Sequence, residues 1–167
     1  KLKVELESGI AARNSSLSDE DKLAVEDLNL ITMKKVIYLC NVDEEGLSKD
    51  NEHVLAVKAY AKAENSEVMI LCGKLESEIA SLETLEEKKE FLDAAGITES
   101  GLDKLTRAAY NMLGLKTYFT AGVKEVRAWT FPKGAKAPQA AGVIHSDFER
   151  GFIKAEVYHC NDLFALG

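Results

Sequence analysis

The chain has 167 residues, enough for one domain of ordinary size or parts of two, with a hydrophobic core. Nearly half of the residues are apolar, which argues against disorder, and no apolar run approaches the roughly 20 residues that span a bilayer. The three cysteines are far apart and odd in number, which fits neither a disulfide framework nor a CxxC metal site. We therefore expect a cytoplasmic protein with no membrane partner.

The charge is distributed unevenly along the chain. Residues 1–115 hold 14 basic and 23 acidic side chains, a net charge of −9, whereas residues 116–167 hold 7 basic and 5 acidic, a net charge of +2. The acidic majority argues against a protein that coats nucleic acid, although the tail could still meet a polyanion. An ordinary solvated surface explains so small a basic excess equally well. Because the chain opens without Met and stops in apolar residues, we expect a fragment of a longer protein.

The first elements in chain order are two predicted helices and a strand. Residues 1–8 have the pattern of the last turns of a helix. Ser18 and the three acidic residues after it predict a second helix to about Leu30, because the hydroxyl caps the first turn and the acids lie at the positive end of the helix dipole. Residues 36–40 form a short apolar run, which is typical of a strand buried on both faces of a parallel sheet.

The next elements complete a strand–helix–strand unit. A helix is predicted to begin at residues 48–50, and its apolar face consists of Val54, Val57 and Ala61. Residues 67–71 form a second short apolar run. A βαβ unit implies parallel strands and a right-handed crossover, so both strands should end at the same edge of the sheet.

Polar residues follow both strands at the edge where parallel sheets bind ligands. Asn41 and Glu44 come after the first strand, and Cys72, Gly73 and Lys74 come after the second. An amide and a carboxylate on a fixed loop could read the edge of a planar base. The alternative is an Asx-type turn that only closes the strand, and N-x-x-E is a weak pattern. Gly73 is likewise open to interpretation as a simple strand-end turn.

Two further helices are predicted before the composition changes. Residues 75–95 should form one helix whose many charges make a solvated face, and Gly96 should stop it. Thr98 or Ser100 should cap the next helix, which ends at Gly114. Its apolar residues recur at helical spacing and are interpreted as core: Leu102, Leu105, Ala109, Met112 and Leu113.

The last third of the chain predicts a separate small α+β module. Residues 117–120 and 126–131 are rich in β-formers around a glycine turn and predict a hairpin. A short helix is expected near residues 139–144, and the alternation in residues 152–158 predicts a half-buried strand. The boundary of this module should lie near residues 114–117.

Several chemistry-bearing residues are weaker candidates. His53, His145 and His159 show no metal-ligand spacing, so we expect them to be surface or hydrogen-bonded residues. Ser146 and Asp147 follow His145, but neighbours on one strand point to opposite faces, which excludes a catalytic triad. A reactive thiol is also disfavoured, because the cysteines that follow the strands lack a basic neighbour placed to lower their pKa.

The aromatic and basic residues of the last third leave two interpretations open. Phe119, Trp129 and Phe131 could stack on bases, although such residues are usually the core of a small β module. Six basic residues could form a phosphate-facing patch for nucleic acid or the ribosome, namely Lys124, Arg127, Lys133, Lys136, Arg150 and Lys154.

Taken in this order, the sequence resembles the YchF/EngD family, the Obg-like ATPases of the translation-factor class of P-loop NTPases. The resemblance covers essentially the whole chain. Its most specific stretches are residues 38–44, residues 116–120 with 126–131, and residues 144–153, and the last two resemble the family's TGS domain.

The resemblance implies a three-layer α/β nucleotide-binding domain with parallel strands and flanking helices, followed by a small α+β, β-grasp-like TGS domain. Residues 1–30 would be the end of a helical, coiled-coil insertion, and residues 31–115 the C-terminal part of the nucleotide-binding domain. Residues 116–167 would be the TGS domain, truncated at its C-terminus.

The resemblance also implies a nucleotide-base site made of Asn41, Val42, Glu44 and residues 72–74. GTPases commonly carry Asn-Lys-x-Asp where this chain has Asn41-Val42-Asp43-Glu44. The longer Glu44 should misplace the carboxylate that selects guanine, so ATP should be accepted, often in preference to GTP. Asn41 would donate to the base N7, Val42 would contact the base and Glu44 would organise the loop. Cys72 and Gly73 would offer backbone N–H groups, and the stem of Lys74 would cover the base.

The implied enzyme is an ATP and GTP hydrolase that uses Mg²⁺ and works with the ribosome or ribosomal RNA. No G-x-x-x-x-G-K-[ST] run occurs in these residues, so we expect this chain to lack catalytic and metal-binding residues and to be inactive alone. The alternative is a non-catalytic module that binds RNA or the ribosome through its TGS part.

Overall fold

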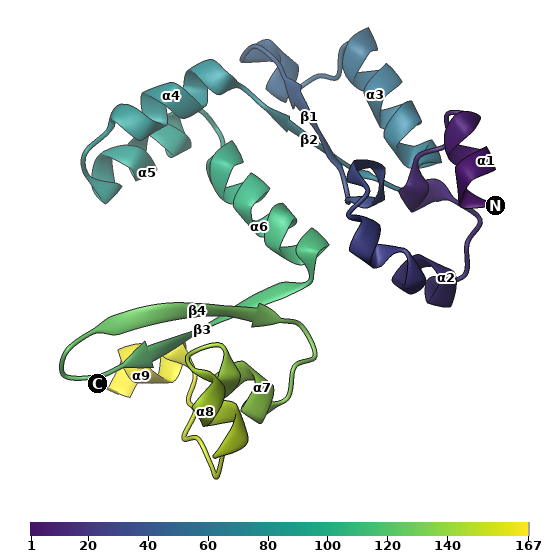
Figure 1. Cartoon of the computed structure of the whole chain (residues 1–167). Coiled ribbons are helices and arrows are strands. Elements are labelled where there is room, and N and C mark those ends of the chain that lie inside the picture. The colour runs from purple at the N-terminus through teal and green to yellow at the C-terminus, as the bar shows by residue number, and fades with distance from the viewer. Residues whose placement is uncertain (167) are drawn as a thin grey trace. The chain divides into compact units, whose positions relative to one another are not determined.

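The computed structural model describes residues 1–166 of the chain. It divides into two compact units, residues 1–109 and the residues from 110 onward, and each is described by itself (Figure 1). No helix within residues 1–166 is long and apolar enough to cross a membrane.

The first unit opens with short helical turns. Ser18 caps α2, because its Oγ accepts a hydrogen bond of 3.1 Å from the backbone N–H of Asp21, as its sequence context predicts. The predicted extension of this helix to Leu30 is wrong, since α2 ends at Ala24 and the chain passes through Asn29 with a left-handed φ of 48°. The turns are α1 (Leu2–Glu7), η1 (Ala12–Asn14), α2 (Asp19–Ala24), η2 (Glu26–Leu28) and η3 (Ile31–Met33).

A parallel strand–helix–strand unit follows, as predicted. Strands β1 (Ile37–Asn41) and β2 (Glu67–Leu71) pair in parallel, and α3 (Glu52–Ala63) connects them. The apolar face of α3 packs inward, since Val54 is only 2% exposed and Ala61 is fully buried. A short η4 turn (Glu45–Leu47) lies between β1 and α3.

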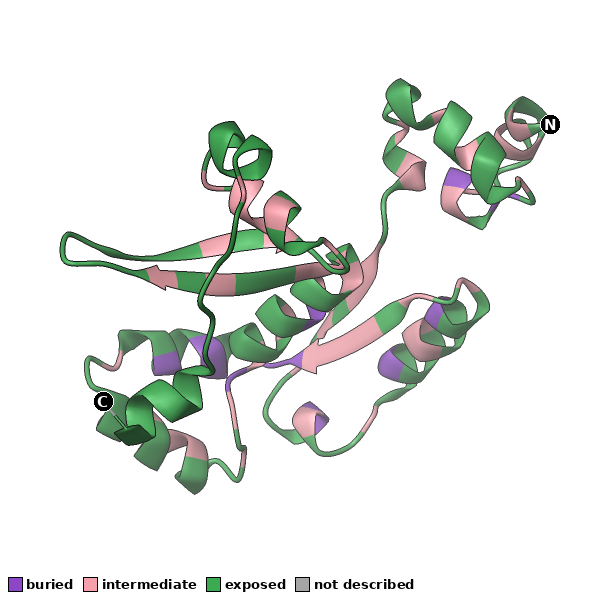
Figure 2. Ribbon diagram, turned by 90° about the horizontal axis from the view of Figure 1, so that it is seen from below, coloured by how far each residue is buried: buried purple, intermediate pink, exposed green. Residues whose placement is uncertain are grey.

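The expectation that the first strand is buried on both faces is wrong. The residues of β1 are half-buried or exposed, and Leu39 retains 45% of its exposure (Figure 2). Within residues 1–166 this sheet has two strands, and a sheet so narrow offers little area for layers of helices to cover both faces. An apolar run therefore marked the strand correctly but not its burial.

The helix predicted over residues 75–95 is two helices, α4 (Gly73–Ser81) and α5 (Leu85–Ala94). Thr84 causes the break, because it forms a capping box: its Oγ1 accepts from the Glu87 N–H, and its own N–H donates to the Glu87 carboxylate. A small core forms where the helices meet, from Cys72, Leu75 and Ile79 with Leu47, Phe91, Leu92 and Ile97 packed against them.

Helix α6 (Gly101–Leu113) begins and ends as predicted. The Oγ of Ser100 accepts from the Asp103 N–H at 3.0 Å, and Gly114 follows with a φ of 67°. Its apolar stripe is only partly covered, because Leu102 and Leu113 are 49% and 58% exposed whereas Leu105, Ala109 and Met112 are half-buried. Helical periodicity locates an apolar face but does not reveal what covers it.

The second unit contains the predicted hairpin. Strands β3 (Leu115–Ala121) and β4 (Val126–Pro132) pair antiparallel in continuous register. The Tyr118 hydroxyl donates to the Ala140 carbonyl at 3.0 Å, which connects the first of the two following short helices to the hairpin. These helices are α7 (Ala137–Gly142) and α8 (Ser146–Arg150).

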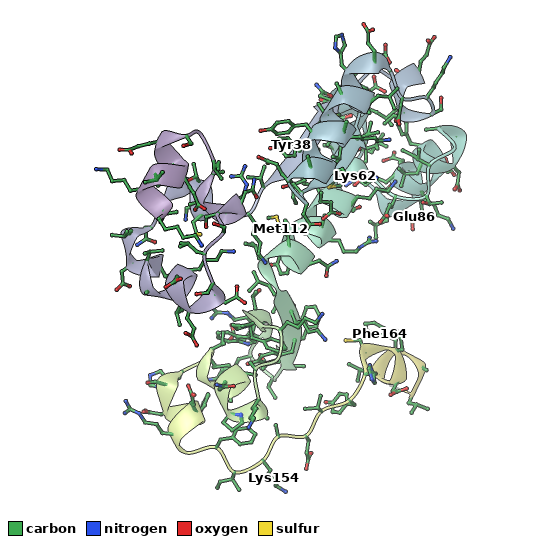
Figure 3. All side chains as sticks on the ribbon, turned by 90° about the vertical axis from the view of Figure 1, so that its right-hand side faces the viewer. Tyr38, Lys62, Glu86, Met112, Lys154 and Phe164 are labelled. Atoms are coloured by element: carbon green, nitrogen blue, oxygen red, sulfur yellow. The ribbon has the colours of Figure 1, made fainter. Side chains whose placement is uncertain are left out.

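The strand predicted over residues 152–158 is wrong. This segment is irregular, Ile153 and Val157 are 91% and 85% exposed, and a helix, α9 (Cys160–Leu166), follows it. Alternation produces a strand only where a neighbouring strand offers hydrogen-bonding partners. Figure 3 shows Lys154 on the irregular connection and Phe164 on the helix. The three-layer and β-grasp arrangements remain predictions.

Candidate functional site

The carboxyl ends of β1 and β2 form a polar rim, as the topology predicts. Asn41 pairs with Leu71 at the last position of the two strands. The Asn41 Oδ1 accepts a hydrogen bond of 2.9 Å from the backbone N–H of Gly73, 32 residues later. The two loops with predicted base contacts are therefore joined directly, while their role in binding stays a prediction.

Gly73 permits this close contact. A Cβ at this position would lie 3.2 Å from the Asn41 Oδ1, which is tighter than ordinary contacts. The backbone conformation of Gly73 does not itself require glycine, because its φ lies outside the left-handed region. Since the Gly73 N–H donates to Asn41, the expected donation from Gly73 to a base is not available in this arrangement. The Nδ2 of Asn41 donates to no acceptor within residues 1–166, so it can still reach a ligand.

Asp43 and Gly46, which the sequence patterns did not single out, organise the loop after β1. The Asp43 Oδ1 accepts from the Gly46 N–H at 2.9 Å, and the Val42 N–H continues the strand ladder to the Leu71 carbonyl at 2.9 Å. A Cβ on Gly46 would come within 2.7 Å of the Val42 Cβ, so only glycine fits there. An Asp followed three residues later by Gly is a turn signal that could have identified this pair.

The Glu44 side chain pairs with Lys74 of the second loop and not with a residue of its own loop. Its Oε1 lies 2.9 Å from the Nζ of Lys74, and both side chains remain more than half exposed. The hydrogen bond to Glu44 raises the pKa of Lys74 above its ordinary value, with smaller support from Glu78 at 3.9 Å. The rim therefore presents an amide beside a neutralised ion pair.

Cys72 is a buried residue at the start of α4. It is 3% exposed and precedes the first residue of α4, so Gly73 and Lys74 lie in the first turn of that helix. The first backbone N–H groups of a helix lack intrahelical partners, and those of α4 begin beside Asn41. A buried thiol of this kind behaves as a small apolar side chain.

The described residues contain no cluster of metal-ligating side chains. Within residues 1–166, no group of three or more His, Cys, Asp or Glu side chains could hold a metal ion. His145 instead caps α8, because its Nδ1 accepts from the Asp147 N–H at 3.2 Å. The expectation that His145, Ser146 and Asp147 lie on one strand is wrong, because Ser146 and Asp147 begin α8.

The six basic candidate residues of the second unit and Phe119 are exposed, whereas Trp129 and Phe131 are half-buried. Phe119 retains 60% of its exposure, and Trp129 lies under the Arg127 guanidinium at 4.2 Å while its Nε1 donates to Thr120. Phe131 packs instead on Tyr118, with ring centroids 5.6 Å apart. The six basic residues fall on several elements: Lys124 in the hairpin turn, Arg127 on β4, Lys133 and Lys136 before α7, Arg150 ending α8 and Lys154 on the irregular segment.

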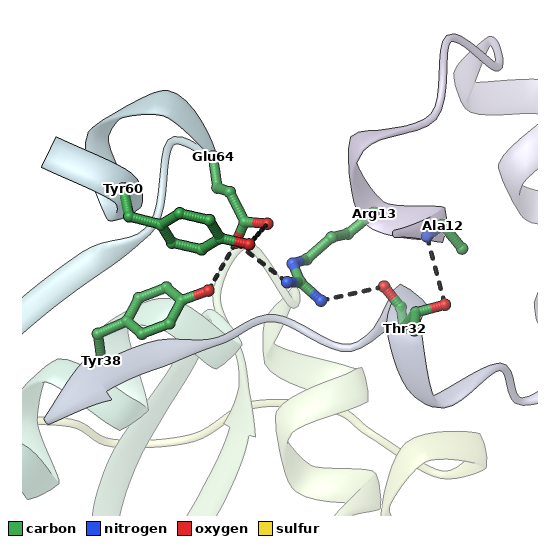
Figure 4. Close-up of polar contacts among 6 residues, drawn as sticks. All are labelled: Ala12, Arg13, Thr32, Tyr38, Tyr60 and Glu64. Atoms are coloured by element: carbon green, nitrogen blue, oxygen red, sulfur yellow. Dashed lines mark hydrogen bonds and ion pairs between the residues drawn. The ribbon is translucent and has the colours of Figure 1, made fainter. Parts of the chain in front are cut away.

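A polar network that sequence reasoning missed lies at the other end of β1 (Figure 4). Arg13 and Glu64 form an ion pair of 3.0 Å whose side chains are only 20% and 13% exposed. The Tyr38 and Tyr60 hydroxyls donate to the same carboxylate at 2.7 and 3.3 Å. The hydrogen bond to Glu64 raises the pKa of Arg13 and of Tyr38, and the Tyr38 and Arg13 hydrogen bonds lower the pKa of Glu64.

A parallel βαβ unit with a polar rim beyond its strand ends defines an α/β protein of the kind that binds ligands at that edge. Comparisons with known proteins find a family model, curated relatives and a solved structure that match this chain. Residues 115–167 match the family model YchF-GTPase_C, described as a protein of unknown function (DUF933).

Over nearly all of its residues, the chain is similar to proteins named ribosome-binding ATPase YchF. The Bacillus subtilis protein is 53% identical over all of this chain and 46% of its own length, and the Escherichia coli O157:H7 protein is 46% identical over 95% of this chain and 43% of its own. The solved structure of the Schizosaccharomyces pombe YchF GTPase superposes with a TM-score of 0.79 at 36% identity, covering 95% of this chain and 42% of that one. The chain belongs to the YchF family, and it spans about half the length of the curated relatives it matches.

Proposed function

We propose that this chain supplies the base-recognition rim and the C-terminal module of a purine-nucleotide hydrolase that works on ribosomes in the cytoplasm. The full-length protein binds and hydrolyses ATP, and GTP less selectively. The chain contains no G-x-x-x-x-G-K-[ST] run, so phosphate binding and hydrolysis with Mg²⁺ are assigned to other parts of the full-length protein.

The juxtaposition of Asn41 with Gly73 is the observation that carries this proposal. The contact of 2.9 Å orients the amide so that its Oδ1 is satisfied by the protein and its Nδ2 is left to donate. Both adenine and guanine carry an N7 acceptor, so this donor serves either purine. The relatives named as an ATPase and as a GTPase agree with a site that uses a contact common to both bases.

The proposed domains follow the family resemblance. Residues 1–30 are the end of the helical insertion, residues 31–115 the C-terminal part of the nucleotide domain and residues 116–167 the TGS module. The match of residues 115–167 to the family's C-terminal model supports the last of these. The ribosome-binding names of the bacterial relatives support a ribosomal partner.

A second candidate is a non-catalytic RNA or ribosome module acting through residues 116–167. The exposed Phe119 and the Arg127–Trp129 stack favour it, because aromatic and guanidinium faces stack on unpaired bases. Substituting Lys133 and Lys136 by Gln should weaken ribosome binding and its salt dependence without changing ATP affinity.

The decisive test of the first proposal measures ATP binding by the full-length protein with Asn41→Ala. Losing the donor should weaken ATP binding by roughly 5- to 100-fold, the range expected when a hydrogen-bonded group is removed. Asn111→Ala, a solvent-exposed change on α6, is the matched control and should leave affinity unchanged. Unchanged ATP affinity in Asn41→Ala, with the fold intact by circular dichroism, would refute a base contact at this rim.

A further inference from the structure

We propose that Lys74 is a specificity-determining residue that withholds the Glu44 carboxylate from guanine. This inference rests on the proposed nucleotide site and adds a residue-level cause for its weak selectivity. The sequence predicts that the extra methylene of Glu44 misplaces the carboxylate. In this proposal, that displacement is only part of the reason for the weak selectivity.

The ion pair is built into the same turn that holds Asn41. Lys74 follows Gly73, whose N–H binds the Asn41 side chain, and its Nζ lies 2.9 Å from the Glu44 Oε1. The Oε1 of Glu78, one turn further along α4, lies 3.9 Å from the same ammonium. Consecutive residues of one helix turn therefore hold both the amide and the carboxylate of the first loop.

The chemistry of the two purines makes this contact selective. Guanine offers two donors on its Watson–Crick edge, N1–H and the exocyclic amine, and a free carboxylate accepts both. Adenine has no donor at either of those atoms, so a free carboxylate would favour guanine. A carboxylate already neutralised by an ammonium is a weaker acceptor held in one orientation, so its advantage for guanine is reduced.

The test compares ATP and GTP dissociation constants of the full-length protein and its variants. The ratio of the GTP to the ATP constant cancels the triphosphate contribution, because both nucleotides carry the same phosphates. Lys74→Met keeps an apolar stem over the base and removes the charge, and it should lower this ratio about two- to fivefold, the range of an exposed ion pair.

Companion variants separate release of the carboxylate from other effects. Glu44→Gln should leave the ratio near the wild-type value, and the Lys74→Met/Glu44→Gln double variant should match Glu44→Gln. Lys89→Met, an exposed lysine on α5, is the control and should change nothing. In the wild-type protein, raising the salt concentration should lower the ratio, because salt screens an exposed ion pair.

An unchanged ratio in Lys74→Met, or equal weakening of both nucleotides, would overturn the role of Lys74 and leave the proposed nucleotide site intact. A wild-type ratio that stays constant with salt would overturn it even if Lys74→Met failed to fold. Binding of neither nucleotide by the wild-type protein would instead refute the proposed function, and this inference with it.

Discussion

Glu64, at the end of α3, holds the guanidinium of Arg13 at 3.0 Å, although 51 residues separate them. Arg13 also donates to the Thr32 carbonyl, so one side chain connects the N-terminal turns to the βαβ unit. Tyr38, which donates to Glu64, lies on the same short strand as Asn41. Strand β1 therefore contributes Tyr38 to this polar network near its start and Asn41 to the candidate site at its end.

Arg13→Met should lower the thermal midpoint of the chain, because it leaves the largely buried Glu64 carboxylate without its cationic partner. Lys62→Met, an exposed neighbour on α3, is the matched control and should have little effect (Figure 3). The Arg13→Met/Glu64→Gln double variant should be less destabilised than the sum of the single changes, measured by thermal unfolding. Strict additivity would show that the two groups do not interact.

Stability should fall in acid partly through Glu64. The Tyr38 and Arg13 hydrogen bonds hold the pKa of this carboxyl below its ordinary value. Its contribution is therefore fully present above the ordinary glutamate pKa and is lost as the pH falls through the lowered pKa. Urea unfolding between about pH 6 and about pH 3 should show a smaller loss of stability in Glu64→Gln than in the wild type. Identical slopes would contradict this role.

Glu76→Ala should destabilise the chain by about 1–3 kcal/mol, because it leaves two backbone donors unpaired. Glu76 is only 7% exposed, and its carboxylate accepts from the N–H groups of Gly101 and Leu102 at 2.6 and 3.1 Å, which holds the start of α6. Glu86→Ala, an exposed change on α5, should cost little by comparison. Urea denaturation measures both, and equal effects would argue against this anchoring role.

Thr84→Ala should destabilise the chain by about 0.5–2 kcal/mol through loss of the helix cap on α5. Thr84→Ser keeps the hydroxyl and should retain most of the stability. The pKa of Glu87 is held below its ordinary value mainly by the hydrogen bond from the Thr84 backbone N–H, which the Ala variant keeps, and in smaller part by the side-chain hydrogen bond that the Ala variant loses. A Ser variant as unstable as the Ala variant would show that the methyl group, not the cap, matters.

Gly101→Ala should be poorly tolerated for a steric reason. An added Cβ would lie 2.8 Å from the Glu76 Oε1 and 2.9 Å from the Leu71 Cβ. In an unobstructed helix, replacing glycine by alanine stabilises, so a loss of thermal stability here would identify the close contact. A gain would show that the carboxylate moves aside freely.

Local signals were sufficient for several elements because their causes are local. A capping serine before three acids placed the start of α2, two short apolar runs separated by a helical stripe gave the βαβ unit, and Gly114 ended α6. Parallel pairing then required Asn41 and Gly73 to meet at one edge, since a crossover returns the chain in the same direction.

Tertiary context decided the rest. Burial of β1, the strand expected at residues 152–158 and the exposure of Leu102 all depend on which neighbours cover a face, and no periodicity reports that. The sequence alone determined that two polar loops share a rim, because strand direction follows from chain connectivity. Only the tertiary structure paired Glu44 with Lys74 and Arg13 with Glu64, because such contacts depend on where flexible side chains 30 and 51 residues apart end in space.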